Sequence, residues 1–162
     1  MFVRTASERD LEAVHDLLVE TWHDTYDAIY GVDGVAAISD RWHSVDWLRQ
    51  MLRRVRSEFI VADTGSELAG MAYAVRDENE SDLVELQELD VRPTMQGRGV
   101  GGMLLEEIQA SFFECGRMRL EVEERNDRAV AFYEADGFVR TGRKLAARGG
   151  DASILTLEKQ LR

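Results

Sequence analysis

Cysteine, lysine and long apolar runs are scarce in this chain of 162 residues. The single cysteine, Cys115, allows no internal disulfide bond, and no cluster of histidine and cysteine has the spacing of a metal site. No apolar run approaches the roughly 20 residues of a membrane span, and the start, Met1 to Arg4, lacks a signal peptide's apolar segment. We therefore expect a cytoplasmic protein with no metal ion and no membrane partner.

The scarcity of lysine accompanies a strongly acidic composition. Lys144 and Lys159 are the only lysines beside 18 arginines, and 31 acidic against 20 basic residues give a net charge of −11. Such a surface disfavours non-specific nucleic-acid binding, so we expect no nucleic-acid partner. Two causes of the acidity remain open, adaptation to a salt-rich cytoplasm and attraction of a cationic substrate. The acids are spread along the chain, which favours the first.

Length and composition predict one soluble domain, residues 1–162. A hydrophobic content of 44% with 31% charged residues is ordinary for a globular protein. A chain of this size can bury a substantial core but is too short for two ordinary domains.

Glycine is concentrated in one short stretch, Gly97 to Gly102. The run before it, Leu83 to Val91, has the pattern of a strand, and apolar residues recur at steps of three and four from Val100 to Phe112, as in an amphipathic helix. Glycines at a helix start leave several backbone N–H groups free to face one ligand, in the positive field of the helix end. The stretch therefore predicts an anion cradle for a phosphate or pyrophosphate.

Two common phosphate-binding motifs fit this stretch poorly. A Walker loop needs Gly-Lys-Ser/Thr, whereas Gly101 is followed by Gly102-Met103, and this excludes it. The glycines do spell the dinucleotide fingerprint G-x-G-x-x-G. A dinucleotide turn is tight, however, whereas Arg92 to Gln96 separate the strand from the first glycine, and too few residues follow for the remaining strand-helix units. NAD binding is thus the weaker alternative.

A third motif matches. Gln96-x-x-Gly99-x-Gly101, preceded by Leu89-Asp90-Val91-x-Pro93, closely resembles the acyl-CoA-binding motif of the GNAT N-acyltransferase superfamily, and Asn126 to Phe138 resembles a second signature of that family. The resemblance covers nearly the whole chain. It implies an α/β (α+β) fold, with a mixed, largely antiparallel sheet of about six to seven strands, about four flanking helices, and a central parallel pair of strands that splays apart to admit CoA.

The resemblance also implies acetyl-CoA as the co-substrate and a set of residues that hold it. Backbone groups of the central strand would bind the pantetheine arm, and the glycine amides would bind the pyrophosphate. The implied residues are Leu89, Asp90, Val91, Gln96, Gly97, Arg98, Gly99, Val100, Gly101, Asn126 and Arg128.

Acyl transfer to an amine requires groups that move protons. A primary amine with a pKa near 10 is protonated at neutral pH, so a base or a chain of waters must take its proton. Glu85 and Glu88 lie on the central strand, three residues apart and so expected on opposite faces, and only one of them is expected to serve. Family spacing slightly favours Glu88. Tyr133 matches the family's tyrosine that protonates the leaving thiolate; the alternative is a buried aromatic.

The acceptor is the least determined part. The section from Thr21 to Trp47 holds all three tryptophans and several aspartates, and aromatic faces with carboxylates favour a cation. Trp22 and Tyr26 are the candidate wall residues, although both could equally be core of a helix. We expect a small-molecule cationic amine as acceptor. A protein N-terminal or lysine acetyltransferase, a non-catalytic acyl-CoA-binding module and a homodimer all stay open.

Overall fold

The computed structural model describes residues 1–145 and 153–162. The strands are β1 (Phe2–Thr5), β2 (Ser57–Asp63), β3 (Leu68–Arg76), β4 (Leu83–Val91), β5 (Arg117–Glu123), β6 (Val139–Leu145) and β7 (Ser153–Gln160). The α-helices are α1 (Leu11–Tyr30), α2 (Val32–Trp42), α3 (Val45–Arg53), α4 (Val100–Ser111) and α5 (Asp127–Ala135), with 3-10 turns η1 (Glu8–Asp10) and η2 (Pro93–Met95). None of the helices so described is long and apolar enough to cross a membrane.

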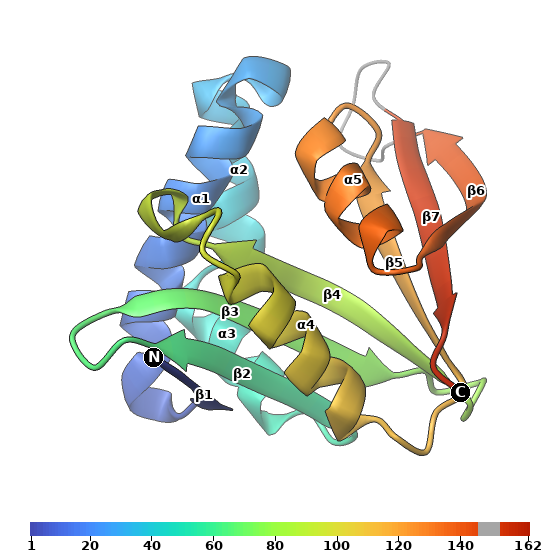
Figure 1. The fold of residues 1–162 in the computed structure, drawn as a ribbon. Coiled ribbons are helices and arrows are strands. Elements are labelled where there is room, and N and C mark those ends of the chain that lie inside the picture. The colour runs from blue at the N-terminus through green and yellow to red at the C-terminus, as the bar shows by residue number, and fades with distance from the viewer. Residues whose placement is uncertain (146–152) are drawn as a thin grey trace. The chain divides into compact units, whose positions relative to one another are not determined.

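The seven strands form one sheet in the order β1-β2-β3-β4-β5-β7-β6 (Figure 1). β1 pairs antiparallel with β2, and β7 pairs antiparallel with both β5 and β6. β4 and β5 are parallel, with Leu83 to Leu86 opposite Arg117 to Leu120. This confirms the predicted mixed, largely antiparallel sheet with a parallel pair at its centre.

The chain divides into two compact units. The first consists of Met1–Ala74 with Glu88–Ser111, and the second of Val75–Gln87 with Phe112–Arg162. β4 therefore begins in the second unit and ends in the first. The prediction of a single domain over residues 1–162 stays a prediction, and part of its range, 146–152, lies outside the described residues.

The core of the first unit follows the apolar stripe of α1. Leu11, Val14, Leu18 and Trp22 recur at steps of three and four, and all are buried. In Figure 1, α4 covers the near face of β2 and β3, whereas α3 lies behind them. Gly70 of β3 allows α4 to approach, because a Cβ there would lie 3.0 Å from Leu104.

Two glycines near the start of α2 have different roles. Gly31 ends α1, with φ 79°. Gly34 instead lies inside α2, because a glycine's cost of about 1 kcal/mol within a helix is outweighed by burial of neighbours such as Val35. α3 then begins after Ser44, whose side chain accepts a hydrogen bond from the Trp47 N–H at 3.1 Å, as an N-cap does.

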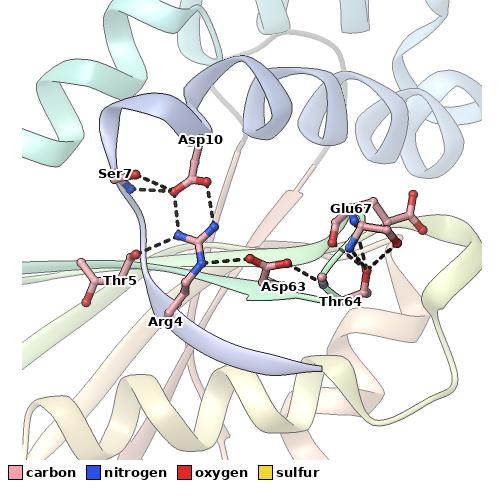
Figure 2. Close-up of polar contacts among 9 residues, drawn as sticks. Arg4, Thr5, Ser7, Asp10, Asp63, Thr64 and Glu67 are labelled. Carbon is pink, nitrogen blue, oxygen red and sulfur yellow. Dashed lines mark hydrogen bonds and ion pairs between the residues drawn. The ribbon is translucent and has the colours of Figure 1, made fainter.

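An arginine joins β1 to the start of the first helical segment (Figure 2). Both terminal nitrogens of Arg4 donate to the two Asp10 oxygens at 2.8 Å, and its Nε donates to Asp63 of β2 at 3.0 Å. Asp10 also accepts from the Ser7 N–H at 2.8 Å, which completes a capping box. The hydrogen bonds from Arg4 are the main cause that lowers the pKa of Asp10 to about 2.

This network predicts a pH-dependent contribution to stability. Because the pKa of Asp10 is about 2 in the folded state and 3.8 otherwise, its contribution is complete above about pH 4 and is lost as the pH falls towards 2. Asp10→Asn should lower the free energy of unfolding by about 2 kcal/mol at pH 7, and its deficit against wild type should shrink below pH 4. Urea unfolding at several pH values measures this. Asp46→Asn, which removes an exposed partner of Arg49, is the matched control and should change stability little. An Asp10→Asn deficit that persists unchanged at pH 2.5 would contradict the assignment.

Candidate active site

The turn from β4 into α4 has the backbone that the glycine stretch predicted. Gly97 and Gly99 have φ of 77° and 82°, the left-handed region that favours glycine. The Gly99 carbonyl accepts from the Met103 N–H at 3.1 Å, so Gly99 is the residue that opens α4. The N–H groups of a helix's first turn have no partner within the helix and carry its positive end. Together these features give Gly97 to Gly101 the backbone that an anion cradle needs.

The flanking residues fix this cradle and add charge to it. The Gln96 side chain donates from Nε2 to the Val91 carbonyl at 3.1 Å, which ties the turn to the end of β4. Arg92 donates to the Leu68 carbonyl at 3.0 Å and pairs with Glu20 of α1. Arg98 is exposed beside the two glycines. The polyphosphate of a ligand in the cradle would thus meet backbone N–H groups and one arginine.

The end of β4 carries two acids that interact. Asp90 and Glu88 are joined by a side-chain hydrogen bond, and Asp90 also accepts one from the Trp22 side chain. Burial, then the charge of Glu88, raises the pKa of Asp90 well above its usual range. Glu88 lies on the other side against His43, whose Nε2 is 3.4 Å from Oε1 of Glu88. The carboxyl group of Glu88, with 20% of its side chain exposed, therefore lies between the Asp90 carboxyl group and an imidazole.

The two candidate wall residues differ in exposure. Trp22 is 8% exposed and belongs to the core of the first unit, where its ring contacts Tyr26 and His43 with centroids 4.6 and 5.0 Å apart. Tyr26 is only partly buried and also contacts Tyr30. Trp22 thus packs in the core, and Tyr26 is the member of this pair with surface left for an acceptor.

The remaining predicted residues lie in the second unit. Glu85 forms an ion pair with Arg119. The Asn126 side chain caps α5 by accepting from the Ala129 N–H at 3.2 Å, and Arg128 follows on the exposed side. Tyr133 is 8% exposed, with Phe132 and Phe138 edge-on to its ring.

Cys115 is not part of this arrangement. Cys115 is fully buried and its Sγ donates to the Ser81 carbonyl at 3.7 Å, while burial raises the pKa of the thiol. These features fit a packing role for Cys115 rather than that of a nucleophile. Within residues 1–145 and 153–162, no group of three or more histidine, cysteine, aspartate or glutamate side chains is placed to hold a metal ion.

The sequence profile of the acetyltransferase (GNAT) family matches residues 11–138, from α1 to the end of the second signature. The chain belongs to the GNAT acetyltransferase family. The predictions of a GNAT fold and of an acyl-CoA-dependent N-acetyltransferase with acetyl-CoA as donor are confirmed at the level of this family.

Two curated proteins illustrate the range of GNAT relatives. N-alpha-acetyltransferase RimI of Mycobacterium tuberculosis is 33% identical over 117 residues, which cover 70% of this chain and 73% of that protein. An uncharacterized protein of Mycobacterium leprae is 35% identical over 106 residues, 63% of this chain. The matched region is 29% of the length of that relative.

Solved GNAT structures share the fold over its whole length. PaiA N-acetyltransferase from Thermoplasma acidophilum, solved in complex with coenzyme A, superposes with a TM-score of 0.83 at 23% identity over 98% of both chains. Ribosomal-protein-alanine N-acetyltransferase from Brucella melitensis gives a TM-score of 0.77 at 22% identity over 99% of both chains. At these identities the likeness shows the fold.

Sequence reasoning missed His43 in this GNAT chain. Another histidine, His23, lies on α1 with its Nδ1 2.6 Å from Oδ1 of Asp27, one turn along the helix. The sequence does carry a signal for His43, because Val35, Ser39 and His43 are spaced four residues apart, as on one face of a helix. The structure buries all three residues. A serine and a histidine at buried positions of one helical face indicate polar groups with a function in the protein interior.

The cradle predicts how this GNAT chain responds to substitution at Gly99. Gly99→Val should reduce CoA affinity at least a hundredfold, because a β-branched residue strains a backbone at φ 82° and blocks approach of the phosphates to the amides. Isothermal titration calorimetry with CoA measures this. Gly102→Ala is the matched control, since Gly102 lies within α4 and no heavy atom is within 4 Å of an added Cβ. Undiminished CoA binding by a folded Gly99→Val protein would remove the cradle assignment, and NAD binding in place of CoA would revive the dinucleotide alternative.

Proposed function

We propose that the protein transfers an acetyl group from acetyl-CoA to a small cationic amine by direct attack in a ternary complex. One observation carries this proposal: a single segment, Glu88 to Gly101, holds both a polarised carboxylate pair and the anion cradle. The cradle suits the pyrophosphate of CoA, and the carboxylate suits the proton of an ammonium group. Both needs of amine acetylation are thus met within one unit of the protein.

Each step of the transfer is assigned to a group of this chain. Glu88 takes the proton of the acceptor ammonium, which leaves a lone pair on nitrogen to attack the thioester carbonyl. Backbone groups of Leu89 and Val91 orient the pantetheine arm, and the Leu89 N–H polarises that carbonyl. Collapse of the tetrahedral intermediate breaks the carbon–sulfur bond, and Tyr133 gives a proton to the leaving thiolate. The nitrogen loses its second proton to solvent, which leaves the neutral amide, and Tyr133 regains a proton from solvent. Glu85 is the weaker candidate for the base, since it already neutralises Arg119.

The preference for a cationic amine rests on the surroundings of α1. Tyr26 and Tyr30 offer partly exposed rings, and Asp27 is half exposed on the same helix. A well-placed ring contributes about 0.5 to 2 kcal/mol to binding of a cation. Trp22 would support such a wall from behind, by packing against Tyr26.

A protein N-terminus is the second candidate acceptor. The relative named N-alpha-acetyltransferase RimI, at 33% identity over 117 residues, favours it. An N-terminal amine has a pKa near 8 rather than 10, so it needs less help from a base. A peptide also needs a groove for its following residues, whereas a small amine needs only the carboxylate and ring surface.

Acceptor choice is testable with a substrate panel. We expect the highest kcat/KM for small amines with a second positive charge, and lower values for peptides with a free N-terminus. Tyr26→Ala should raise the KM for the best amine about 3- to 30-fold, from the loss of one ring contact, and leave the KM for acetyl-CoA unchanged. Tyr26→Phe keeps the ring and is the control. If peptides give a higher kcat/KM than every small amine, the assignment changes to the second candidate acceptor. If the protein binds CoA but acetylates no acceptor, a non-catalytic acyl-CoA-binding module is favoured.

The role of Tyr133 has a separate test. Tyr133→Phe should lower kcat about 10- to 1,000-fold with little change in CoA affinity, because the hydroxyl acts on the leaving thiolate. Single-turnover release of free thiol measures the chemical step directly. Phe132→Leu is the control for packing around α5. Unchanged single-turnover rates in Tyr133→Phe would return Tyr133 to a purely structural role.

A further inference from the structure

Four side chains of the first unit form a closed cluster at the end of β4, here called the His43 cluster: His43, Glu88, Asp90 and Trp22. His43 Nε2 lies 3.4 Å from Glu88 Oε1, and Glu88 is hydrogen bonded to Asp90. Asp90 accepts a hydrogen bond from Trp22, and the Trp22 ring meets the His43 ring edge-on, with centroids 5.0 Å apart. Each member therefore contacts two others.

Packing alone does not explain a histidine at this position. His43 is 1% exposed, and its Nδ1 is buried with no hydrogen-bond partner among the described residues. A buried polar atom without a partner costs about 1–3 kcal/mol, whereas phenylalanine would fill similar space beside Trp22 without that cost. The interaction of Nε2, which faces Glu88, is what explains an imidazole at this position.

The hydrogen bond between Glu88 and Asp90 requires a proton between the two carboxyl groups, because ionised carboxylates only accept. Burial, reinforced by the charge of Glu88, raises the pKa of Asp90 well above its usual range, which places that proton on Asp90. Glu88 is the member of this pair whose charge acts on Asp90.

The neighbouring elements place few charged groups against the His43 cluster. From α1, His15 Nδ1 donates to the His43 carbonyl at 2.6 Å, so His15 contacts the backbone of His43 rather than its ring. Glu20 of α1 and Arg92 pair with each other. From β3, Tyr73 is buried in the same core as Trp22, with no partner in the described residues for its hydroxyl. The carboxylate of Glu88 is thus the acid of the cluster that is free to accept a proton.

We propose that His43 and Asp90 are positioning residues for Glu88. His43 Nε2–H and the carboxyl O–H of Asp90 both donate to the Glu88 carboxylate, and Trp22 holds the two donors in place. This proposal rests on the proposed function, in which an N–H bond of the acceptor ammonium breaks, its proton goes to Glu88, and the nitrogen keeps the electron pair that forms the new amide bond. The donors fix one orientation of the carboxylate, so that its remaining lone pair faces the acceptor.

Paired substitutions at each position separate hydrogen bonding from packing. His43→Phe should lower kcat about 10- to 100-fold while the KM for acetyl-CoA stays within about twofold, and His43→Gln, which keeps an N–H donor, should recover most of that loss. Asp90→Leu should show a similar loss, and Asp90→Asn, whose amide mimics a protonated carboxyl, should recover most of it. Thermal unfolding checks that all four variants are folded. His43→Phe with wild-type kcat across the pH range, or Asp90→Asn as impaired as Asp90→Leu, would overturn the proposal.

A measurement made without any acceptor amine tests this proposal separately from the proposed function. In wild type labelled with ¹³C at aspartate and glutamate carboxyl carbons, NMR should show the Asp90 carboxyl protonated at pH 7, and His43→Phe should shift the Glu88 resonance. An Asp90 carboxyl ionised at pH 7 would overturn the proposal even in an active enzyme. Conversely, wild type that acetylates no amine while Asp90 is protonated would remove the proposed function and leave the cluster assignment standing.

Discussion

The backbone between β4 and α4 must turn through conformations that only glycine adopts readily. Gly97 and Gly99 provide them, with φ of 77° and 82°, and the Gly99 carbonyl then begins the hydrogen bonding of α4. The carboxylates at the end of β4 and the amides at the start of α4 therefore belong to one continuous segment, Glu88 to Gly101. The backbone geometry of this segment contributes to the spacing between the proposed proton acceptor and the proposed anion cradle.

The same locality explains which parts of the fold the sequence predicted. β4 was expected at Leu83 to Val91 and has these bounds, and the hairpin at Thr64 to Glu67 closes with a 3.0 Å bond from the Thr64 N–H to the Glu67 carbonyl. Strand alternation and turn residues specify such elements within a few residues. The second helix, α2, is less visible in the sequence, because the burial of Val35 decides whether a helix continues through Gly34.

The candidate site was predictable to the extent that it is local. Gln96 and the glycines occupy one turn whose spacing is visible in the sequence, and the structure gives them the expected backbone. His43 and Glu88 are 45 positions apart, and no periodicity predicts that a residue after α2 meets the end of β4. The same holds for Trp22, whose contact with Asp90 depends on how α1 lies against that strand. Contacts of this kind are set by tertiary packing, which sequence patterns specify only as buried or exposed.

The abundance of arginine over lysine has a structural cause that bears on the acidity of the chain. Arg4 contacts both oxygens of Asp10 and also Asp63, and Arg117 joins Glu80 to Glu158, geometries that a planar guanidinium allows and a single ammonium does not. Such arginines hold together segments far apart in sequence.

Acids engaged in this way contribute little to a long-range field, because each is neutralised nearby and the rest is screened by salt. The net charge of −11 is therefore a weak attractant for a cationic acceptor. A carboxylate at close range is a stronger one, since the energy between two charges falls with distance and rises as water is excluded. In the proposed function, an ammonium group would therefore be recognised mainly by the Glu88 carboxylate, which lies beside the buried Asp90.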